Sequence, residues 1–211
     1  MTINAREKNK KQRTEQIILA AEELFSEKGL YDVQMQDIAT KANVGIATLF
    51  RYFPKKENII VEVAVFALGK FQEDLQKIAD SEKNAFDKLE HLFDYFLEIA
   101  NGPARKVTLF REAFESYSSY RNEPLENIDA YIEIQGVLSN EIFKIIKQGE
   151  VDGSIRSDIK MELALTTITN CFGIFSTKIT LHEKVANFPS GITAIDQQQF
   201  LKEMFLSYIR A

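Results

Sequence analysis

Residues 37–59 read DIATKANVGIATLFRYFPKKENI, and this stretch decides the fold. Apolar residues recur at helical spacing on both sides of Asn43. Ala39 is small enough to let a second helix cross close by, and Asn43 tolerates the positive φ that a tight turn often needs. Val44 would fill the angle between the two helices. The stretch therefore predicts two short helices joined by a tight turn.

The second of these helices carries groups that suit a polyanion. Gly45 and Thr48 leave its start slim, with free backbone N–H groups that can meet a phosphate. Polar donors for DNA phosphates and for one base edge then follow within a few residues, at Arg51, Tyr52, Lys55 and Lys56. An ordinary pair of packed helices would explain the apolar spacing but not this cluster. The pattern favours a DNA-reading element.

Helical spacing continues outward in both directions from this stretch. Before it, Thr14 is a candidate N-cap and Gly29 a candidate stop for a first helix. After it, Pro54 suits a boundary before a long helix over residues 56–79. Five further helices are expected, at residues 85–100, 105–120, 125–149 (stopped at Gly149), 159–183 and 194–211. The sequence thus predicts an all-α, nine-helix protein of two domains.

Charge is unevenly distributed along the 211 residues, whose net charge is -5 and pI about 5.3. Residues 1–56 hold 10 Lys and Arg against 7 Asp and Glu, a net of +3, whereas residues 57–211 hold 16 against 24, a net of -8. Either this is random surface variation, or a basic front faces nucleic acid while an acidic body discourages nonspecific contact with it. Arg6, Lys8, Lys10, Lys11 and Arg13 reinforce the basic end, as a DNA-binding arm, a solvated terminus or both.

Several classes of protein are not expected from the sequence. The polar, basic start has no apolar core of a signal peptide, and no run of about 18 apolar residues suggests a membrane span. We therefore expect a cytoplasmic protein without membrane association. Cys171, the single cysteine, cannot form an internal disulfide and is more often a small core residue than a thiol sensor.

The residues just described resemble the N-terminal domain of the TetR family of transcriptional regulators. The family pattern A-x-x-L-F-x-x-x-G-[FY] is matched by AAEELFSEKGLYD, and the helix–turn–helix pattern I-A-x-x-A-G-V-S-x-G-T-[LI]-Y-x-[HY]-F by the opening stretch. The sequence likeness covers about the first quarter of the chain, and the nine-helix plan covers nearly all of it. By this resemblance the DNA-binding residues are Gln34, Gln36, Gly45, Ile46, Ala47, Thr48, Phe50, Arg51, Tyr52, Lys55 and Lys56.

The chain departs from the family pattern at several of these positions. Asn43 stands where the family has Gly in the turn, and Gly45 stands where it has the Ser that caps the next helix. Phe50 replaces the Tyr that follows in the family pattern. Gln34 and Lys55 stand where Ser, Thr or Asn usually begin the second and fourth helices, and Ala47 is a mild change. Longer or cationic side chains thus replace several neutral phosphate contacts.

The resemblance also implies how the rest of the chain works. It implies a basic arm (1–13), a helix–turn–helix DNA-binding domain (14–55) and a helical ligand-binding and dimerisation domain (56–211). The last two helices, about 158–182 and 195–210, would form a four-helix interface in a homodimer. The final helix fits independently, because two adjacent apolar rows need more than one neighbour. A dimer would place two recognition helices about 34–36 Å apart on a palindromic operator of double-stranded DNA.

The family further implies a cavity for a small-molecule effector. Aromatic lining would favour an apolar or aromatic ligand, whose binding would tilt residues 56–79 and release the operator, making the protein a repressor. Such aromatic stripes are more often plain core. A DNA-binding protein without a small-molecule ligand, acting through a protein partner or as an activator, therefore remains the alternative. The candidate lining residues are Phe110, Phe114, Tyr117, Phe143, Phe172 and Phe175.

No residues suggest an enzyme, a cofactor or a metal site. His91 and His182 stand far apart in the sequence without a carboxylate or Cys arrangement around them, and surface or capping roles are expected for both. Residues 150–158, EVDGSIRSD, resemble a calcium loop only in passing. Arg156 would stand among the ligands, and no bidentate Glu follows at the required place.

Overall fold

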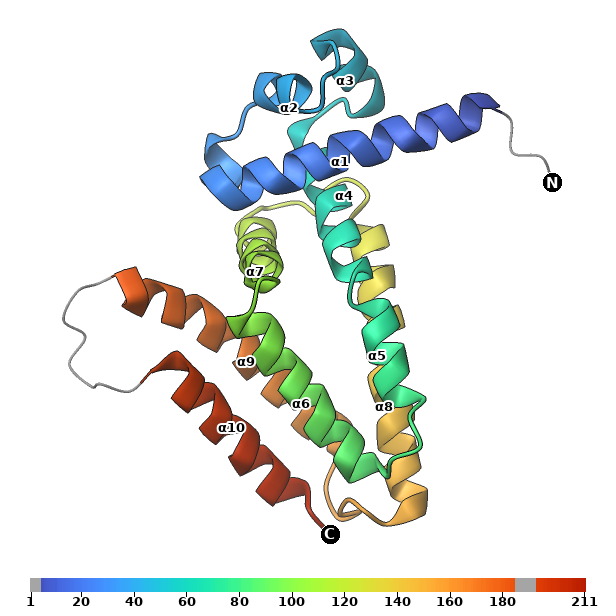
Figure 1. Cartoon of the computed structure of the whole chain (residues 1–211), viewed down its shortest axis with the longest axis vertical. Coiled ribbons are helices and arrows are strands. Elements are labelled where there is room, and N and C mark those ends of the chain that lie inside the picture. Colours follow the sequence, from blue (N-terminus) through green and yellow to red (C-terminus); the bar gives the residue numbers. More distant parts are fainter. Residues whose placement is uncertain (1–4, 185–192) are drawn as a thin grey trace. The chain divides into compact units, whose positions relative to one another are not determined.

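The computed structural model describes residues 5–184 and 193–211 of the chain. These residues form helices and connections without a β-strand, so the predicted all-α fold is confirmed. The chain divides into two compact units, whose helices are labelled in Figure 1. The amino-terminal unit comprises Met1–Lys70 and Ala113–Ile134, and the carboxy-terminal unit comprises Phe71–Glu112 and Gln135–Ala211.

The compact units differ from the predicted domain limits. The first helix beyond residue 55 clusters with the amino-terminal unit, as do residues 113–134, which are far away in the sequence. The functions assigned to the predicted domains stay predictions. The helices that belong wholly to the amino-terminal unit are α1 (Ala5–Asp32), α2 (Met35–Lys41), α3 (Ile46–Tyr52) and α4 (Lys56–Gly69).

Helix α1 is longer than predicted. It begins at Ala5, so Thr14 lies inside it rather than at its start, because nothing in the basic segment interrupts helical hydrogen bonding. The predicted stop at Gly29 is real: its φ of 81° interrupts the helix, and α1 resumes for only three residues. Glycine adopts this left-handed conformation without steric cost.

The core of the amino-terminal unit follows the predicted spacing. Helix α1 packs against α2 and α4, and α2 packs against α3. The Gln16 side chain of α1 donates a hydrogen bond of 2.8 Å to the Ala42 carbonyl, which satisfies the end of α2. Fully or nearly fully buried apolar residues join the helices: Ile17, Ala21, Phe25, Ile38, Ala39, Ala42, Leu49, Phe53 and Ile59.

The predicted helix over residues 56–79 is divided in two. Helix α4 ends at Gly69, and α5 (Gln72–Ala79) begins after a break at Lys70 and Phe71. The described residues therefore contain ten helical segments, and they match the nine-helix plan when α4 and α5 are counted as one interrupted helix.

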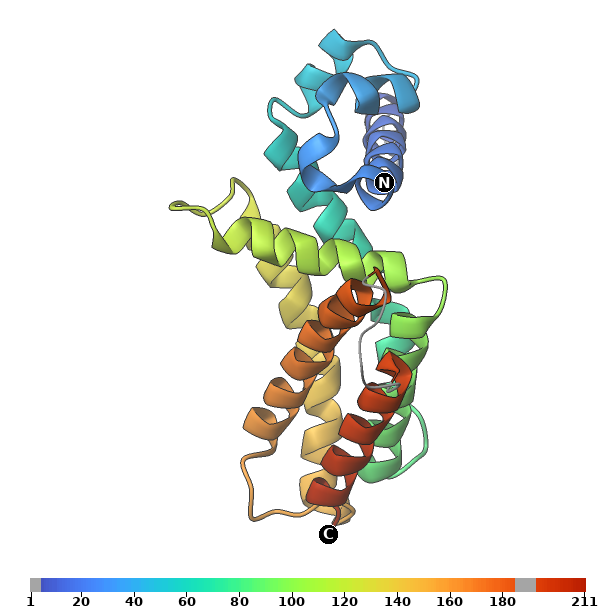
Figure 2. The same ribbon diagram turned by 90° about the vertical axis from the view of Figure 1, so that its left-hand side faces the viewer.

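The remaining helices form or enter the carboxy-terminal unit. The limits between the units fall inside two of these helices, α7 and α8. Within the carboxy-terminal unit α6 packs against α5 and α10, and α9 lies alongside α10 (Figure 2). The helices are α6 (Ala85–Asn101), α7 (Arg105–Ser119), α8 (Ile128–Asp152), α9 (Met161–Lys184) and α10 (Ala194–Ile209).

Helix α8 neither starts nor stops where the sequence predicted. It begins at Ile128, after Asn127 adopts a positive φ of 65°, and it continues through Gly149. A Cβ atom at Gly149 would lie 2.2 Å from Cδ1 of Ile155, so the glycine provides room for a close contact rather than a helix end. The last residue of α8 and the turn that follows then cap α6: the Ala85 N–H donates to Asp152 at 2.9 Å, and the Phe86 N–H donates to Ser154 at 3.0 Å.

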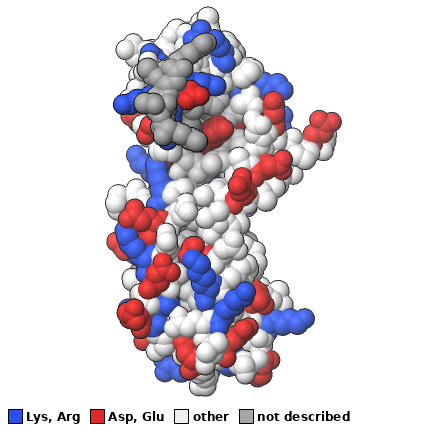
Figure 3. Space-filling view, turned by 90° about the vertical axis from the view of Figure 1, so that its right-hand side faces the viewer, with Lys and Arg blue, Asp and Glu red and all other residues white. Residues whose placement is uncertain are grey.

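Aromatic rings fill the centre of the carboxy-terminal unit. Phe93 of α6 is fully buried, and its ring centroid lies 5.3 Å from that of Phe172 on α9 and 5.0 Å from that of Phe205 on α10. Such tilted ring pairs add attraction to the gain from apolar burial. Charges of both signs are mixed on the lower half of the face in Figure 3, which belongs to this unit.

Candidate nucleic-acid interface

The turn between α2 and α3 has the geometry that the sequence predicted. Asn43 adopts a positive φ of 50°, and the N–H of Val44 donates to the Ala39 carbonyl at 2.9 Å. The Ala42 N–H closes the end of α2 by donating to Ile38 at 2.8 Å. These bonds fix the direction in which α3 leaves α2, so the predicted helix–turn–helix is confirmed.

Helix α3 begins at Ile46, and its N-cap residue, Gly45, provides no side-chain cap. The Gly45 backbone is extended, and its carbonyl accepts the N–H groups of Thr48 at 2.8 Å and Leu49 at 3.0 Å. A serine at this position would add a hydroxyl acceptor for the first turn. The expected loss of a cap at Gly45 is therefore confirmed.

The outer surface of α2 and α3 presents the predicted DNA-binding residues. Leu49 and Phe53 are buried, whereas Phe50 remains 47% exposed with no core role. The Arg51 guanidinium lies 5.8 Å from the centroid of the Tyr52 ring, which holds the cation near the ring face. Gln34, Gln36, Gly45, Ala47, Phe50, Arg51 and Lys55 are exposed, and Ile46, Thr48, Tyr52 and Lys56 are half-buried.

Lys56 has a structural contact that the sequence did not predict. Its ammonium group donates a hydrogen bond of 3.1 Å to the backbone carbonyl of Tyr31, at the end of α1. Burial lowers the pKa of Lys56, although the neighbouring carboxylates of Glu57 and Asp32 oppose this shift. Replacing Lys56 would therefore loosen the α1–α2 connection besides removing a charge.

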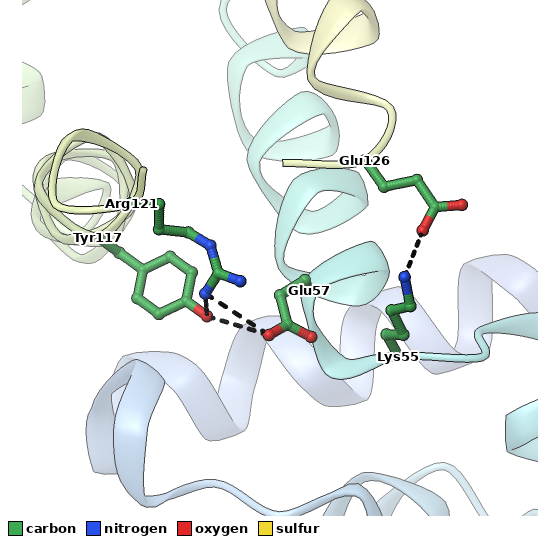
Figure 4. A network of polar contacts seen from close by, with 5 residues as sticks. All are labelled: Lys55, Glu57, Tyr117, Arg121 and Glu126. Carbon is green, nitrogen blue, oxygen red and sulfur yellow. Dashed lines mark hydrogen bonds and ion pairs between the residues drawn. The ribbon is translucent and has the colours of Figure 1, made fainter. Parts of the chain in front are cut away.

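The start of α4 is held by a residue from the α7–α8 connection. The Lys55 N–H donates to Oδ1 of Asn58 at 3.1 Å, and the Lys55 ammonium lies 3.2 Å from a carboxylate oxygen of Glu126 (Figure 4). Hydrogen bonds from the Lys55 and Asn58 side chains lower the pKa of Glu126, which keeps its carboxylate charged.

A second polar group, at and just beyond the end of α7, also contacts the first turn of α4. Arg121 donates to the Tyr117 hydroxyl at 2.9 Å, and that hydroxyl donates to Glu57 at 3.4 Å (Figure 4). The Tyr117 ring also packs edge-on against Tyr31, with the ring centroids 5.6 Å apart. The sequence did not predict Glu57, Arg121 or Glu126, because partners this far apart leave no local pattern. The only signal was Lys55, a cation where the family pattern has Ser or Asn.

The six candidate ligand-lining residues are divided between the two units. Phe114 and Tyr117 belong to the amino-terminal unit, and the Phe114 ring packs on Tyr131 with the centroids 4.6 Å apart. Phe110 and Phe172 are buried in the carboxy-terminal unit, where Phe143 is 37% exposed. The Phe175 side chain lies outside the described residues, as does that of His182. A ligand-lining role for these residues stays a prediction.

Helix α10 separates its two predicted apolar rows. Phe205 and Ile209 are buried in the carboxy-terminal unit and Leu201 is half-buried, whereas the adjacent row remains exposed. In that exposed row, Phe200 is 63% exposed, Met204 54% and Tyr208 51%.

The part of the chain that the structure describes contains no helix long and apolar enough to cross a bilayer. Within the same residues, no group of three or more His, Cys, Asp or Glu side chains is placed to hold a metal ion.

Comparison with known proteins agrees with this geometry. Residues 17–63, which include the helix–turn–helix, match the model of the bacterial regulatory proteins of the tetR family. The chain therefore carries a DNA-binding domain of the TetR family. The fatty acid metabolism regulator protein of Bacillus subtilis (strain 168) is 26% identical over 174 residues, which are 82% of this chain and 84% of that protein.

Further TetR-family relatives extend the likeness beyond the helix–turn–helix. The repressor KstR2 of Mycolicibacterium smegmatis is 24% identical over 152 residues, 72% of this chain and 71% of the relative. The crystal structure of the regulator FadR from Bacillus subtilis, in complex with stearoyl-CoA, superimposes with a TM-score of 0.70 at 22% identity. It covers 91% of this chain and 97% of its own, so the shared fold includes the body as well as the DNA-binding helices.

Proposed function

We propose that this protein is a dimeric repressor of the TetR family that binds a palindromic operator and leaves it when a small apolar or aromatic ligand binds. The exposed surface of α2 and α3 carries the proposal. It combines a rigid helix–turn–helix with exposed Arg51, Phe50 and Gln36, which no core contact explains. Guanidinium and amide groups can bind base edges or phosphates, and an apolar ring can contact a thymine methyl.

The homodimer is supported by the exposed row of α10. Three large side chains along one helix, Phe200, Met204 and Tyr208, are each more than half exposed in the single chain. Apolar surface of this extent is uncommon on a monomer and typical of an interface. A second copy that packs α10 against α10 would bury it and would pair two recognition helices for a palindrome.

The proposed ligand is supported by the relatives. The Bacillus subtilis relative is named for fatty acid metabolism, and the FadR structure contains stearoyl-CoA. Long-chain acyl thioesters are therefore the first compounds to test as effectors. The aromatic and aliphatic interior of the carboxy-terminal unit is compatible with an apolar chain.

A protein without a small-molecule ligand is the second candidate, and the Phe172 contacts favour it. The Phe172 ring packs against both Phe93 and Phe96, with centroid distances of 5.3 and 6.3 Å, and belongs to the apolar core. A residue with these contacts is a core residue in the structure described. On this alternative, the protein acts through a protein partner or as an activator.

The central experiment selects DNA with the full chain. Duplexes enriched from a random library, and the promoter of the protein's own gene, would be footprinted over a series of salt concentrations. We expect a palindromic site whose affinity falls steeply with salt, and a clear loss of affinity in Tyr52→Ala. If Tyr52→Ala bound the site with the same affinity as the original chain at every salt concentration, the assigned interface would be contradicted. Release by stearoyl-CoA, but not by coenzyme A alone, would favour the first candidate over the second.

A further inference from the structure

Lys55 has an anionic partner before any DNA is present. The sequence predicts that this lysine, at the start of α4, contacts a DNA phosphate. In the structure its ammonium group instead faces the Glu126 carboxylate at 3.2 Å (Figure 4). The two residues are 71 positions apart and both belong to the amino-terminal unit. Their side chains are 65% and 58% exposed, so the pair is open to solvent and accessible to a phosphate.

We propose that Glu126 is a built-in competitor of DNA for Lys55, and that it lowers operator affinity by occupying this phosphate-binding lysine in the free protein. The inference rests on the proposed DNA binding and adds an affinity-setting residue outside the helix–turn–helix. The α7–α8 connection would then take part in DNA binding without touching DNA.

The backbone around Glu126 holds its carboxylate in place. Leu125 is 4% exposed, which anchors the connection in the amino-terminal unit. Asn127 has a positive φ of 65°, and the Ile128 N–H donates to the Leu125 carbonyl at 3.2 Å, which closes a tight turn. Because the chain is fixed on both sides of Glu126, the longer and more flexible Lys55 side chain is the partner that must turn away.

Asn58 links the carboxylate to the backbone of α4. This asparagine is 6% exposed, its Oδ1 accepts the Lys55 N–H, and its side chain also binds Glu126. Asn58 therefore joins the Lys55 backbone to the Glu126 carboxylate, which places that carboxylate beside the lysine whose ammonium group it faces. Glu126→Gln keeps an acceptor for Asn58 while it removes the charge.

The sign of the effect follows from charge. A phosphate that replaces the Glu126 carboxylate at Lys55 must break the existing ion pair and then remain near a like charge. Exposed ion pairs are weak, and we therefore expect Glu126→Gln to bind DNA only about three- to tenfold more tightly. Freeing one cation also adds up to one phosphate contact, which should steepen the slope of log affinity against log salt by up to about 0.9.

The test measures DNA affinity of the full chain by fluorescence anisotropy, at several salt concentrations, on the selected operator and on an unrelated duplex. Glu126→Gln should gain affinity on both duplexes, because phosphate contacts do not depend on sequence. Glu123→Gln is the matched control, since it removes the same charge from an exposed position of the same connection. It should change affinity by less than about twofold, because the contacts described pair Lys55 with Glu126 and not with Glu123, and salt screens an exposed charge.

A double-mutant cycle with Lys55→Met identifies the mechanism. Lys55→Met should lose affinity, and adding Glu126→Gln to it should give no further change. An equal gain from Glu126→Gln in both backgrounds would show general repulsion of DNA and would overturn the proposal. A loss of affinity in Glu126→Gln would show that Glu126 orients Lys55 for phosphate, which would also overturn it.

The cycle also separates this inference from the proposed function. If Lys55→Met and Tyr52→Ala lose affinity while Glu126→Gln behaves as the original chain, the competitor is disproved and the DNA interface stands. If none of these variants changes DNA binding, the assigned interface fails and the competitor fails with it. Melting curves of each variant, compared with that of Glu123→Gln, exclude loss of folding as the cause.

Discussion

Two exposed surfaces of the molecule, the outer surface of α3 and the outer row of α10, differ in what they present. Helix α3 has seven residues and leaves a guanidinium, polar groups and the Phe50 ring to solvent. Helix α10 has 16 residues and exposes a continuous row of large apolar side chains, Phe200, Met204 and Tyr208. Neither surface is explained by the packing of the unit to which it belongs.

The difference between these surfaces indicates different partners. An exposed cation with hydrogen-bond donors suits a charged, hydrated partner such as DNA, whose affinity depends on salt. A row of apolar side chains suits a protein surface, whose affinity depends on area removed from water. One molecule would therefore carry a DNA surface on its amino-terminal unit and a self-association surface on its carboxy-terminal unit.

The largest effect is expected from a charge in the α10 row. Phe200→Glu would bury an unpaired carboxylate in the proposed interface, and we expect the dissociation constant of the dimer to rise at least about 100-fold, or ~2.7 kcal/mol. Sedimentation velocity over a range of concentrations measures it. Val151→Glu is the control, because Val151 is 88% exposed on α8, outside the row. If the Phe200→Glu protein remained dimeric, the exposed row of α10 would not be the dimer interface.

The next effect is expected on the DNA surface. Arg51→Ala should weaken operator binding about 10- to 100-fold, because a guanidinium bound to a base edge or phosphate contributes about 1–3 kcal/mol. The dimer constant should not change. Lys77→Ala loses the same charge from α5, where this lysine pairs only with Glu73 and Asp74 in the contacts described, and should bind DNA normally. Equal losses in both variants would mean that total charge, not the α3 surface, governs binding.

Much of the fold was predictable because its determinants are local. Helical spacing, the Asn43 turn and the Gly29 interruption are written within a few residues each, and all three are found in the structure. Gly149 shows the limit of local reasoning: a glycine was expected to stop α8, but the helix continues through it, and Ile155 occupies the space beside it. The contact between Gly149 and Ile155 depends on the turn that follows α8, and the helical spacing of α8 does not predict that turn.

The site was predictable to the same extent and for the same reason. The exposed residues of α2 and α3 follow from helical periodicity, whereas the partner of Lys55 is decided by how the α7–α8 connection reaches α4. Exposed polar residues have no period that reveals a distant partner. The same applies to the contacts of Tyr117 with Tyr31 and Glu57, which no local pattern indicates; its ligand-lining role stays a prediction.

Two glycines of α8 allow the packing of the carboxy-terminal unit to be tested by stability. Gly149→Ala places a Cβ against Ile155 at 2.2 Å, and we expect the free energy of unfolding to fall by about 1–3 kcal/mol from overpacking. Gly136→Ala is the control in the same helix, because nothing lies within 4 Å of its Cβ position. Its free energy of unfolding should rise by up to about 1 kcal/mol, because alanine has a higher helix propensity than glycine. Urea denaturation measures both, and a gain in both variants would show that Ile155 moves aside freely.

The smallest effect is expected at Gly45, on the DNA surface. Its extended backbone has a φ of -67°, and a Cβ would meet only Thr48 Oγ1 at 4.0 Å, so a larger residue fits. Gly45→Ser should raise the free energy of unfolding by about 0.3 kcal/mol, because the hydroxyl accepts an N–H of the first turn. Gly45→Ala fits equally well but cannot cap, and it should be less stable than the original chain. If urea denaturation gave the two variants the same stability, a cap at this position would not contribute to stability. The glycine at the start of α3 would then be explained by DNA contact alone.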